Sequence, residues 1–353
     1  MAPFPCSARN SLNGSWPRLQ AHDLSHTSNL HSFVMASAGP PYISAGKIRE
    51  LVSMLDVINV VEKGLADFSN GKVVQPVRSF LNTTEHGGFL GVMPAYCYSS
   101  NCLATKVLTL YTDNESKGVP NIQAIVVQMD PSTGSVIALL DGVTITNMRT
   151  AAASAVALKY TKPPQSDLTL CIVGSGVQAR AHAEALREIC SYKEIRVWGR
   201  NLERIQKCVA DIGGDAVNAK PYQDLRTACE GADIIVTVSM AKEPIVKGEW
   251  LKEGTVILSV GACLPDWREL DDELMNNSLV IVDSRAGAMK EAGDILLSKC
   301  DIYAEVGEVV AKGPVNMETA RSHGKKFILF KSLGLAIEDA VTGQLIYEKF
   351  NQK

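Results

Sequence analysis

The sequence lacks the features of a secreted, membrane-spanning or nucleic-acid-binding protein. Its nine cysteines are odd in number and scattered, without a disulfide ladder. Cys97 and Cys102 lie near each other, but no histidine pair follows at zinc-finger spacing, so no metal site is predicted. No apolar stretch approaches the roughly 20 residues needed to cross a bilayer. The 35 lysines and arginines are interleaved with 38 acidic residues, and no basic run resembles a nucleic-acid footprint. We therefore expect a cytoplasmic protein with reduced thiols and with neither a nucleic-acid nor a membrane partner.

The chain has the size and composition of a two-domain globular protein. It contains 353 residues, of which 46% are apolar and 21% charged, and its formal net charge is -3. The first 34 residues are rich in serine, asparagine and histidine, and they lack the long apolar core of a secretory signal. We expect residues 1–34 to be disordered or to precede an initiator at Met35.

The region after Met35 predicts a helix followed by an antiparallel sheet. From Ser44, apolar residues recur at helical spacing as far as Ile58, which indicates one amphipathic helix. Short segments punctuated by Gly, Pro, Asn and Asp then predict strands at residues 75–81, 88–93, 104–111 and 123–129. A turn at residues 130–134 predicts a hairpin that pairs residues 125–129 with residues 136–140.

The second half of the chain predicts a parallel sheet. An alanine-rich helix at residues 145–160, ended by Pro163 and Pro164, is expected to link the domains. Apolar strands at residues 168–173, 194–198, 234–238, 256–260 and 279–282 then alternate with helices. A last amphipathic helix at residues 332–350 is expected to pack back on the first domain. The predicted fold is α/β, with a Rossmann-type dinucleotide-binding domain at residues 156–321 and a smaller α+β domain formed by residues 35–155 and 322–353.

The strongest motif is a glycine turn between a predicted strand and a predicted helix. Gly174, Ser175, Gly176, Val177 and Gln178, followed by alanine, come directly after the strand at residues 168–173. Glycines at these positions permit a tight turn, and the helix N-terminus offers free N–H donors to a pyrophosphate. The motif therefore predicts a dinucleotide site, although the same glycines could form a purely structural turn.

The end of the next predicted strand favours NADPH over NADH. An acidic residue there would accept hydrogen bonds from the ribose hydroxyls of NAD, but the chain has Gly199, Arg200 and Asn201. Arg200 can pair with a 2′-phosphate and stack on adenine, unless it is a surface arginine. Thr237, Val238 and Gly261 end later strands, where an open sheet presents its ligand crevice.

Three cations stand in segments that are otherwise apolar or small. They are Arg78, Lys106 and Arg149, and none of them has an acidic neighbour in the sequence. A buried cation needs an anionic partner, so the three could form a carboxylate clamp together with a group that moves a proton. From the residues alone, each could equally be a strand-edge or helix-surface charge.

Several motifs together make the chain resemble the ornithine cyclodeaminase and mu-crystallin family. They are Gln75-Pro76-Val77-Arg78, Gly91-Val92-Met93-Pro94-Ala95-Tyr96, Asp141-Gly142, Arg149-Thr150-Ala151-Ala152, the glycine turn, Pro265-Asp266-Trp267-Arg268-Glu269-Leu270 and Phe330-Lys331-Ser332-Leu333-Gly334. The resemblance spans about Pro41 to the C-terminus. The segments at residues 91–96 and 265–270 point to the mu-crystallin branch, which implies ketimine reductase activity.

The resemblance also implies roles for particular residues. Arg78 and Arg149 correspond to the carboxylate clamp, and Lys106 to the active-site lysine. Cys263 stands where cyclodeaminases have an acid, which argues against ornithine cyclisation, and we expect it to line the pocket rather than act as a nucleophile. Glu291 resembles a pocket residue, although it could be a helix-surface acid. The predicted cofactor site comprises Gly174, Ser175, Gly176, Val177, Gln178, Arg200, Asn201, Thr146, Thr237, Val238, Gly261 and Ser332.

The expected activity is NADPH-dependent reduction of cyclic ketimines such as pyrroline- or piperideine-carboxylate. An amino-acid dehydrogenase and an ornithine cyclodeaminase of the same fold remain alternatives. A thyroid-hormone-binding or crystallin-like role is a further alternative of a different class. The resemblance also implies a homodimer joined through the domain that does not bind the cofactor.

Overall fold

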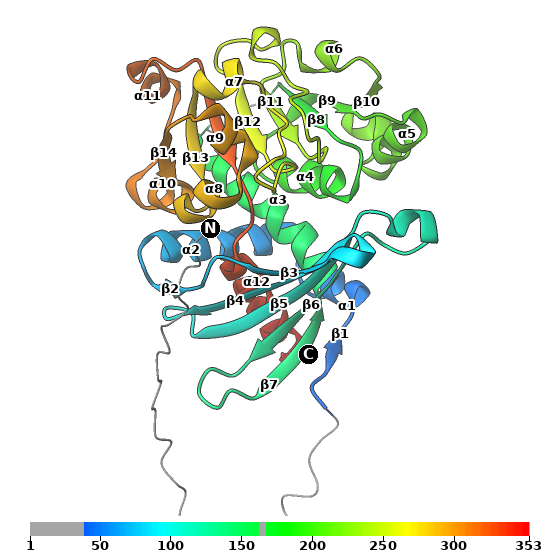
Figure 1. Ribbon diagram of the computed structural model, residues 1–353, viewed down its shortest axis with the longest axis vertical. Helices are drawn as coiled ribbons and strands as arrows, with labels where there is room; N and C mark the ends of the chain where they lie inside the picture. The colour runs from blue at the N-terminus through cyan, green and yellow to red at the C-terminus, as the bar shows by residue number, and fades with distance from the viewer. Residues whose placement is uncertain (1–38, 162–166, 353) are drawn as a thin grey trace, which may run out of the picture. The chain divides into compact units, whose positions relative to one another are not determined.

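The computed structural model describes residues 39–161 and 167–352, and one compact unit of the chain spans Pro40–Lys353. Residues 1–34, Pro163 and Pro164, for which the sequence carries expectations, lie outside the described residues. Two sheets with their helices make up this unit (Figure 1). Within the described ranges, no helix combines the length and apolar character required to cross a membrane.

The first sheet has seven strands in the order β1-β7-β6-β5-β4-β2, with β3 paired to β4. The strands are β1 (Tyr42–Ile43), β2 (Val73–Val74), β3 (Ser79–Thr83), β4 (Gly88–Cys97), β5 (Cys102–Tyr111), β6 (Ile122–Met129) and β7 (Val136–Asp141). The pairs from β2 to β7 are antiparallel, as expected, and only β1 joins in parallel. The hairpin of β6 and β7 confirms the predicted turn. The C-terminal helix α12 (Ala336–Asn351) packs against β4, β5 and β6, as predicted for the last helix.

The single helix expected from Ser44 is two helices. These are α1 (Ala45–Leu51) and α2 (Met54–Ser69), and Val52 and Ser53 separate them. Ser53 forms a capping box with Asp56, which satisfies the backbone N–H groups of these two residues and starts a new helix. Leu55, which the helical spacing places on the buried stripe, is 45% exposed because the helical phase restarts at this break.

Helix α3 (Gly142–Thr161) contacts elements of both sheets, as expected of a linking helix. It begins before the predicted residue 145 because Asp141 accepts a hydrogen bond from the Thr144 N–H at 2.7 Å. A side chain at Gly142 would meet the backbone of Ala124 and Ile125 at 2.7 Å. Asp141 and Gly142 thus allow the helix to start directly at the end of β7.

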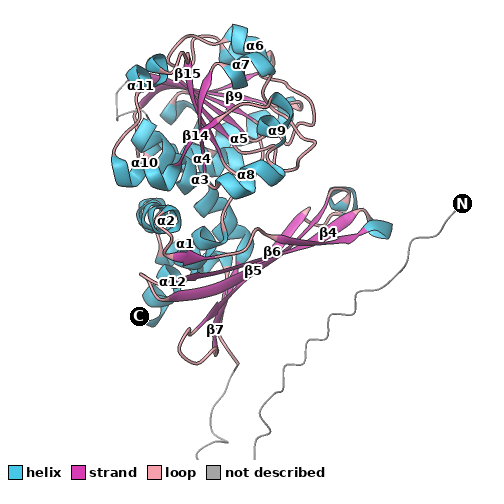
Figure 2. Cartoon of the chain, turned by 60° about the vertical axis from the view of Figure 1, so that its left-hand side comes forward, coloured by secondary structure: helices cyan, strands magenta, loops and turns pink. Residues whose placement is uncertain are grey.

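The second sheet has eight strands, all parallel, in the order β10-β9-β8-β11-β12-β15-β13-β14. The strands are β8 (Leu168–Val173), β9 (Tyr192–Trp198), β10 (Ala219–Tyr222), β11 (Ile234–Thr237), β12 (Val256–Ser259), β13 (Ser278–Val282), β14 (Ile302–Glu305) and β15 (Phe327–Lys331). Its other helices are α4 (Val177–Arg187), α5 (Leu202–Asp211), α6 (Leu225–Cys229), α7 (Asp272–Asn276), α8 (Arg285–Glu291), α9 (Gly293–Ser298), α10 (Val306–Lys312) and α11 (Met317–Ser322). Figure 2 shows these helices gathered around the strands. The strand order reverses between β8 and β11, where a doubly wound sheet opens a ligand crevice.

The boundary expected at residue 321 needs correction, because the parallel sheet continues beyond it. Strand β15 lies between β12 and β13, so residues 327–331 belong to the second sheet and not to the first domain. All five residues of β15 are buried. Strands β10 and β14 were also not predicted, since both are short and only partly buried.

Candidate functional site

The glycine turn joins β8 to α4 at the point where the strand order reverses. Gly174 has a φ of +139°, and a side chain there would meet the Val238 carbonyl oxygen at 2.7 Å. Gly176 is the N-cap of α4 and makes no side-chain cap, so the N–H groups of the first turn stay available. A side chain at Gly176 would meet nothing within 4 Å. The turn therefore brings backbone donors up to open space, which suits an anion such as a pyrophosphate.

Two polar atoms near this turn are buried without a hydrogen-bond partner among the described residues. They are Thr146 Oγ1 on α3 and Gln178 Oε1 on α4. Gln178 uses its amide nitrogen to bond Asn147 at 3.2 Å, which ties the two helices together. A buried polar atom left unpaired in a native fold calls for an explanation, and a bound ligand is one such explanation. The atoms fit the polar groups of a dinucleotide.

The three residues that follow β9 differ in their surroundings and contacts. The side chain of Arg200 is exposed. Asn201 is the N-cap of α5, and its side-chain oxygen accepts from the Arg204 N–H at 3.0 Å. Gly199 is needed for close packing, because a side chain there would meet Ser175 Oγ at 2.8 Å. The end of β9 thus lies directly against the glycine turn.

A buried carboxylate, Glu269, holds together the loops that follow β11 and β12. It is 0% exposed and accepts from the Thr237 hydroxyl at 2.7 Å and from the Gly261 N–H at 2.9 Å. Both the N–H and the hydroxyl of Ser239 bind its other oxygen at 2.6 Å. Two predicted cofactor residues, Thr237 and Gly261, therefore donate hydrogen bonds to a protein carboxylate. Glu269 thus ties the ends of β11 and β12 together next to Val238, which contacts the glycine turn at Gly174.

A second buried acid, Asp294, binds the backbone at Glu269. Asp294 accepts from the backbone N–H groups of Glu269 and Leu270 at 2.8 and 3.1 Å. The ammonium of Lys331, at the end of β15, lies 2.9 Å from the other oxygen of Asp294. Both charged side chains are 0% exposed, so neither charge is left buried without a partner.

Lys106 and Arg149 lie together in a buried ion-pair cluster. The Lys106 ammonium is 2.7 Å from Asp339, and Arg149 is 2.8 Å from Glu338 and 3.2 Å from Asp339. Burial and the nearby Arg149 lower the pKa of Lys106 to about 8, against the opposing effect of Asp339. Burial also raises the pKa of Glu338 to about 7, although Arg149 opposes it. Lys106 and Glu338 can therefore both change protonation state near neutral pH.

Arg78 binds three groups from the other half of the chain. Its guanidinium lies 2.6 Å from Glu291 and donates to the carbonyl oxygens of Leu333 at 3.1 Å and Cys263 at 3.2 Å. The Arg78 side chain is 14% exposed, so it keeps limited access to a ligand. Burial raises the pKa of the Cys263 thiol, which disfavours the thiolate that a nucleophile requires.

The two arginines meet at the loop between β15 and α12. Arg78 donates to the Leu333 carbonyl, and the Arg149 guanidinium lies so close to Gly334 that a side chain there would collide with it. Asp283 holds this loop by accepting from the N–H groups of Leu333 and Gly334. The hydroxyl of Ser332, a predicted cofactor residue, also bonds Asp283 at 3.3 Å and is fully buried.

A small pocket of about 80 Å³ opens beside these groups. Arg78, Glu291, Asp283 and Met93 contribute to its lining. Neither Lys106 nor Arg149 lines the pocket. The structure thus brings the three predicted cations to one region but gives only Arg78 a face on the pocket.

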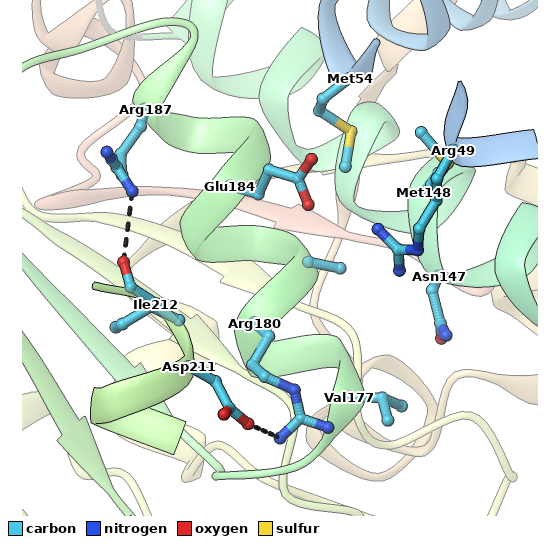
Figure 3. A pocket seen from close by; sticks show the side chains of 11 residues that line it. Arg49, Met54, Asn147, Met148, Val177, Arg180, Glu184, Arg187, Asp211 and Ile212 are labelled. Atoms are coloured by element: carbon cyan, nitrogen blue, oxygen red, sulfur yellow. Dashed lines mark hydrogen bonds and ion pairs between the residues drawn. The ribbon is translucent and has the colours of Figure 1, made fainter. Parts of the chain in front are cut away.

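A larger pocket of about 360 Å³ lies along α4 (Figure 3). Figure 3 shows Arg180 and Asp211, which are 3.4 Å apart, on one side of it. Of the predicted site residues, only Val177 contributes to this lining. Within residues 39–161 and 167–352, no group of three or more His, Cys, Asp or Glu side chains is arranged to hold a metal ion.

The sequence interpretation missed the acidic partners of the site. They are Glu269, Asp283, Asp294, Glu338 and Asp339, each at most 1% exposed. Acidic residues inside segments expected to pack are a usable signal, because a buried carboxylate requires donors or a cation. Glu338 and Asp339 are adjacent in a helix that was expected to pack on the first sheet, and their burial could have indicated partners for Lys106 and Arg149.

Comparison with known proteins agrees with this architecture. Ketimine reductase mu-crystallin of Rattus norvegicus is 46% identical over 316 residues, which cover 88% of this chain and 98% of that protein. Delta(1)-pyrroline-2-carboxylate reductase of Thermococcus litoralis, solved in complex with NADH and L-proline, superimposes with a TM-score of 0.83. It is 38% identical, and the match covers 88% of this chain and 98% of that one.

A third relative has a different named activity. An archaeal alanine dehydrogenase dimer with bound NAD superimposes with a TM-score of 0.80 and is 28% identical. The match covers 89% of this chain and 96% of the alanine dehydrogenase. The sequence model of the ornithine cyclodeaminase/mu-crystallin family matches residues 42–353. With this span and a relative at 46% identity, the chain belongs to the ornithine cyclodeaminase/mu-crystallin family.

Proposed function

We propose that this protein reduces cyclic ketimines that carry a carboxylate, such as pyrroline- or piperideine-carboxylate, with NADPH as the reductant. The observation that carries the proposal is the convergence of Arg78 and Arg149 on the loop at Leu333 and Gly334. This loop leads from the parallel sheet to α12, which also carries the partner of Lys106. The named activities of the rat and Thermococcus relatives support the same substrate class.

The described residues fit a dinucleotide at the glycine turn. Gly176 leaves open space for a pyrophosphate, Gly174 supplies the positive φ of the turn, and Thr146 and Gln178 offer unpaired oxygens. When bound, the reduced nicotinamide supplies a hydride to the imine carbon. The protein positions the reactants and stabilises charge, because hydrogen bonds to Glu269 already fix the ends of β11 and β12.

Arg78 is the proposed anchor for the substrate carboxylate. Its guanidinium faces the small pocket and already holds the carboxylate of Glu291. A substrate carboxylate would share or replace this contact, since guanidinium groups bind carboxylates through paired hydrogen bonds. Arg149 lies against Gly334 and is paired with Glu338 and Asp339, so it would support the loop whose Leu333 carbonyl binds Arg78.

Lys106 is the proposed source of the proton on the imine nitrogen, and because its ammonium is buried and does not line the small pocket, the proton would have to pass through a relay. Protonation makes the imine carbon electron-poor and therefore ready to accept a hydride. With its pKa lowered to about 8, Lys106 is a better proton donor at neutral pH than an ordinary lysine. Asp339 holds the ammonium in place at 2.7 Å.

The preference for NADPH rests on the end of β9. Arg200 is exposed there, next to Gly199, and the Asn201 side-chain oxygen is engaged as a helix cap. An exposed guanidinium at this position can bind a 2′-phosphate, and no acidic residue stands at the strand end to bind a ribose 2′-hydroxyl.

A cofactor oxidation assay tests the function. Purified protein is mixed with NADPH and either pyrroline-2-carboxylate or piperideine-2-carboxylate, and the absorbance of the reduced cofactor is followed. Loss of absorbance with formation of the cyclic amino acid is the expected result. Activity only with pyruvate and ammonia would indicate an alanine dehydrogenase, and conversion of ornithine to proline would indicate a cyclodeaminase. Binding of thyroid hormone without any turnover would favour a binding role instead.

We also infer a homodimer formed through the first sheet, in a protein of the cytoplasm. Large apolar side chains on this sheet are exposed, among them Val74 at 54%, Leu81 at 61% and Val136 at 42%. The archaeal alanine dehydrogenase is a dimer. No disulfide joins the eight cysteines in the described part of the chain, which fits a reducing compartment. Light scattering on the purified protein should give twice the mass of one chain.

A further inference from the structure

We propose that Cys97 and Cys102 form a reversible redox pair, a dithiol that a hydroperoxide oxidises to a cross-strand disulfide. The two residues are the last of β4 and the first of β5, and they are direct partners in the antiparallel register. Opposed residues in such a ladder have Cα atoms about 4.5–5.5 Å apart and side chains on the same face. A disulfide spans Cα separations of about 4.4–6.8 Å, so the bond can form without a change of register.

The two thiols lie under a short, exposed loop. Cys97 and Cys102 are each 0% exposed, whereas residues 98–101 between them are all exposed. The Ser99 hydroxyl lies 3.2 Å from the Cys97 sulfur, and the Ser100 hydroxyl donates to the Cys102 sulfur at 3.2 Å. A peroxide therefore needs only a displacement of this loop to reach the sulfurs.

The surroundings make the two thiols unequal. Burial disfavours the Cys97 thiolate, but hydroxyl and backbone donors of Ser99 and Ser100 outweigh it and hold the pKa of Cys97 below its ordinary value. Burial raises the pKa of Cys102, and the neighbouring charge of Cys97 adds to the increase. The Cys97 thiol donates to the Asp67 carboxylate at 3.9 Å, a long contact that opposes the thiolate but is weaker than the two serine contacts at 3.2 Å. Cys97 is thus the better initial nucleophile, and Cys102 is placed to resolve the product.

The chemistry balances with the peroxide as the oxidant. The Cys97 thiolate attacks one peroxide oxygen, the O–O bond breaks, and the leaving hydroxide takes a proton to become water. The sulfur of Cys102 then attacks the sulfenic acid at Cys97, the S–S bond forms, and the second hydroxide leaves as water with the proton of the Cys102 thiol. Two thiols lose two electrons and two protons, and one peroxide becomes two waters.

Another close pair of thiols provides an internal comparison. Cys171 on β8 hydrogen-bonds to Cys229 on α6, and both are 0% exposed within an apolar cluster of the second sheet. The hydrogen bond with Cys229 and burial raise the pKa of Cys171 well above its ordinary value. This pair should stay reduced in the folded protein, because its thiolate is disfavoured and apolar side chains surround it.

The test is thiol mapping of the reduced, full-length protein after brief treatment with hydrogen peroxide. Remaining thiols are alkylated under denaturing conditions, and tryptic peptides are analysed by mass spectrometry. Residues 79–106 form one tryptic peptide that contains both cysteines. We expect this peptide to lose two hydrogens and to take no alkyl label, whereas dithiothreitol restores both labels. Cys171 and Cys229 should remain alkylated.

Variants separate the two roles. Cys102→Ser should leave Cys97 as a sulfenic acid that dimedone traps, and Cys97→Ser should leave Cys102 reduced. Cys300→Ser, at a partly exposed cysteine between α9 and β14, should not alter the disulfide. The proposal is overturned if the wild-type peptide keeps both alkyl labels while other cysteines oxidise. It is also overturned if Cys97 ends as a sulfinic acid or bonded to another chain. The wild-type measurement decides the matter even if a variant fails to fold.

Discussion

The ammonium of Lys106 on β5 lies 2.7 Å from a carboxylate oxygen of Asp339 on α12, and each side chain is 1% exposed. The two residues are far apart in the chain and meet only because α12 packs against the first sheet. Burial and Arg149 lower the pKa of Lys106 to about 8. If the protonated lysine assists the reduction, kcat/KM should fall as the pH rises through about 8. The measurement is the pH profile of ketimine reduction. Lys106→Met should lower kcat/KM by about 10²–10⁴-fold and remove the fall in kcat/KM near pH 8. The same fall in the variant would exclude Lys106 as its source.

The same pKa predicts how stability depends on pH. The pKa of Lys106 is lower in the folded state than its ordinary value of 10.5, so the folded protein releases this proton first. Between pH 8 and 10.5 the lysine binds more protons in the unfolded state than in the folded state. The contribution of Lys106 to the free energy of unfolding therefore rises with pH in this range. Urea unfolding of wild type and Lys106→Met across this range isolates the effect. The free energy of unfolding of the wild type should increase relative to that of Lys106→Met as the pH increases. A constant difference between the two proteins would contradict the lowered pKa of Lys106.

Arg78 should matter only for substrates that carry a carboxylate. Its guanidinium faces the small pocket and already binds the carboxylate of Glu291. Arg78→Met removes the charge, and we expect KM for pyrroline-2-carboxylate to rise about 10–100-fold, the loss of one charged hydrogen-bond pair. The matched control is 1-pyrroline, which lacks the carboxylate. Equal losses for the two imines would show that Arg78 has a structural role.

Arg200 should determine the choice between the two cofactors. Arg200→Ala removes the exposed guanidinium at the end of β9, so NADPH affinity should fall about 10–100-fold while NADH affinity changes little. The control is Arg226→Ala, which removes another exposed arginine of the same sheet region, one paired with Glu230. Kd values from fluorescence titration give the comparison. A parallel loss of both cofactors would place Arg200 outside the 2′-phosphate site.

Glu269 should stabilise the fold and the cofactor site together. It accepts four hydrogen bonds, from Thr237, Gly261 and two groups of Ser239. Glu269→Gln presents an N–H group to these donors, and we expect it to lower the free energy of unfolding by about 3 kcal/mol and to weaken cofactor binding. Glu249→Gln, at an exposed acid, is the control and should change neither quantity. Intact cofactor affinity in Glu269→Gln would mean that the carboxylate serves stability alone.

The glycine turn offers a pair of substitutions with opposite expectations. Gly176 has ordinary φ and open space around it, so Gly176→Ala should fold normally but bind the cofactor weakly, because the added methyl group points into the proposed pyrophosphate site. Gly174→Ala should lower stability by about 1–3 kcal/mol, because φ is +139° and the methyl group would meet the Val238 oxygen. Thermal unfolding and cofactor titration of both variants, with Gly46→Ala as the control, distinguish the two. Undiminished cofactor binding in Gly176→Ala would place the pyrophosphate elsewhere.

The sequence alone determined the fold class and the place of the glycine turn. Both follow from short-range signals: apolar periodicity identifies strands such as β8, and Gly174 with Gly176 marks the strand-to-helix turn. Apolar strands predict a parallel sheet because both faces must be buried. Where the local signal was weak, as for β10 and β14, the strands were missed.

Only the tertiary structure decided how charges pair. Arg78, Lys106 and Arg149 have no acidic neighbours in the sequence, yet each is bound to a carboxylate contributed from beyond residue 290. Strand β15 likewise joins the sheet of residues far upstream. Such contacts depend on which surfaces pack together, and local patterns carry no information about a partner that lies across the fold. The cost of burying an isolated charge predicts that a partner exists, but only the packing of α8 and α12 identifies it.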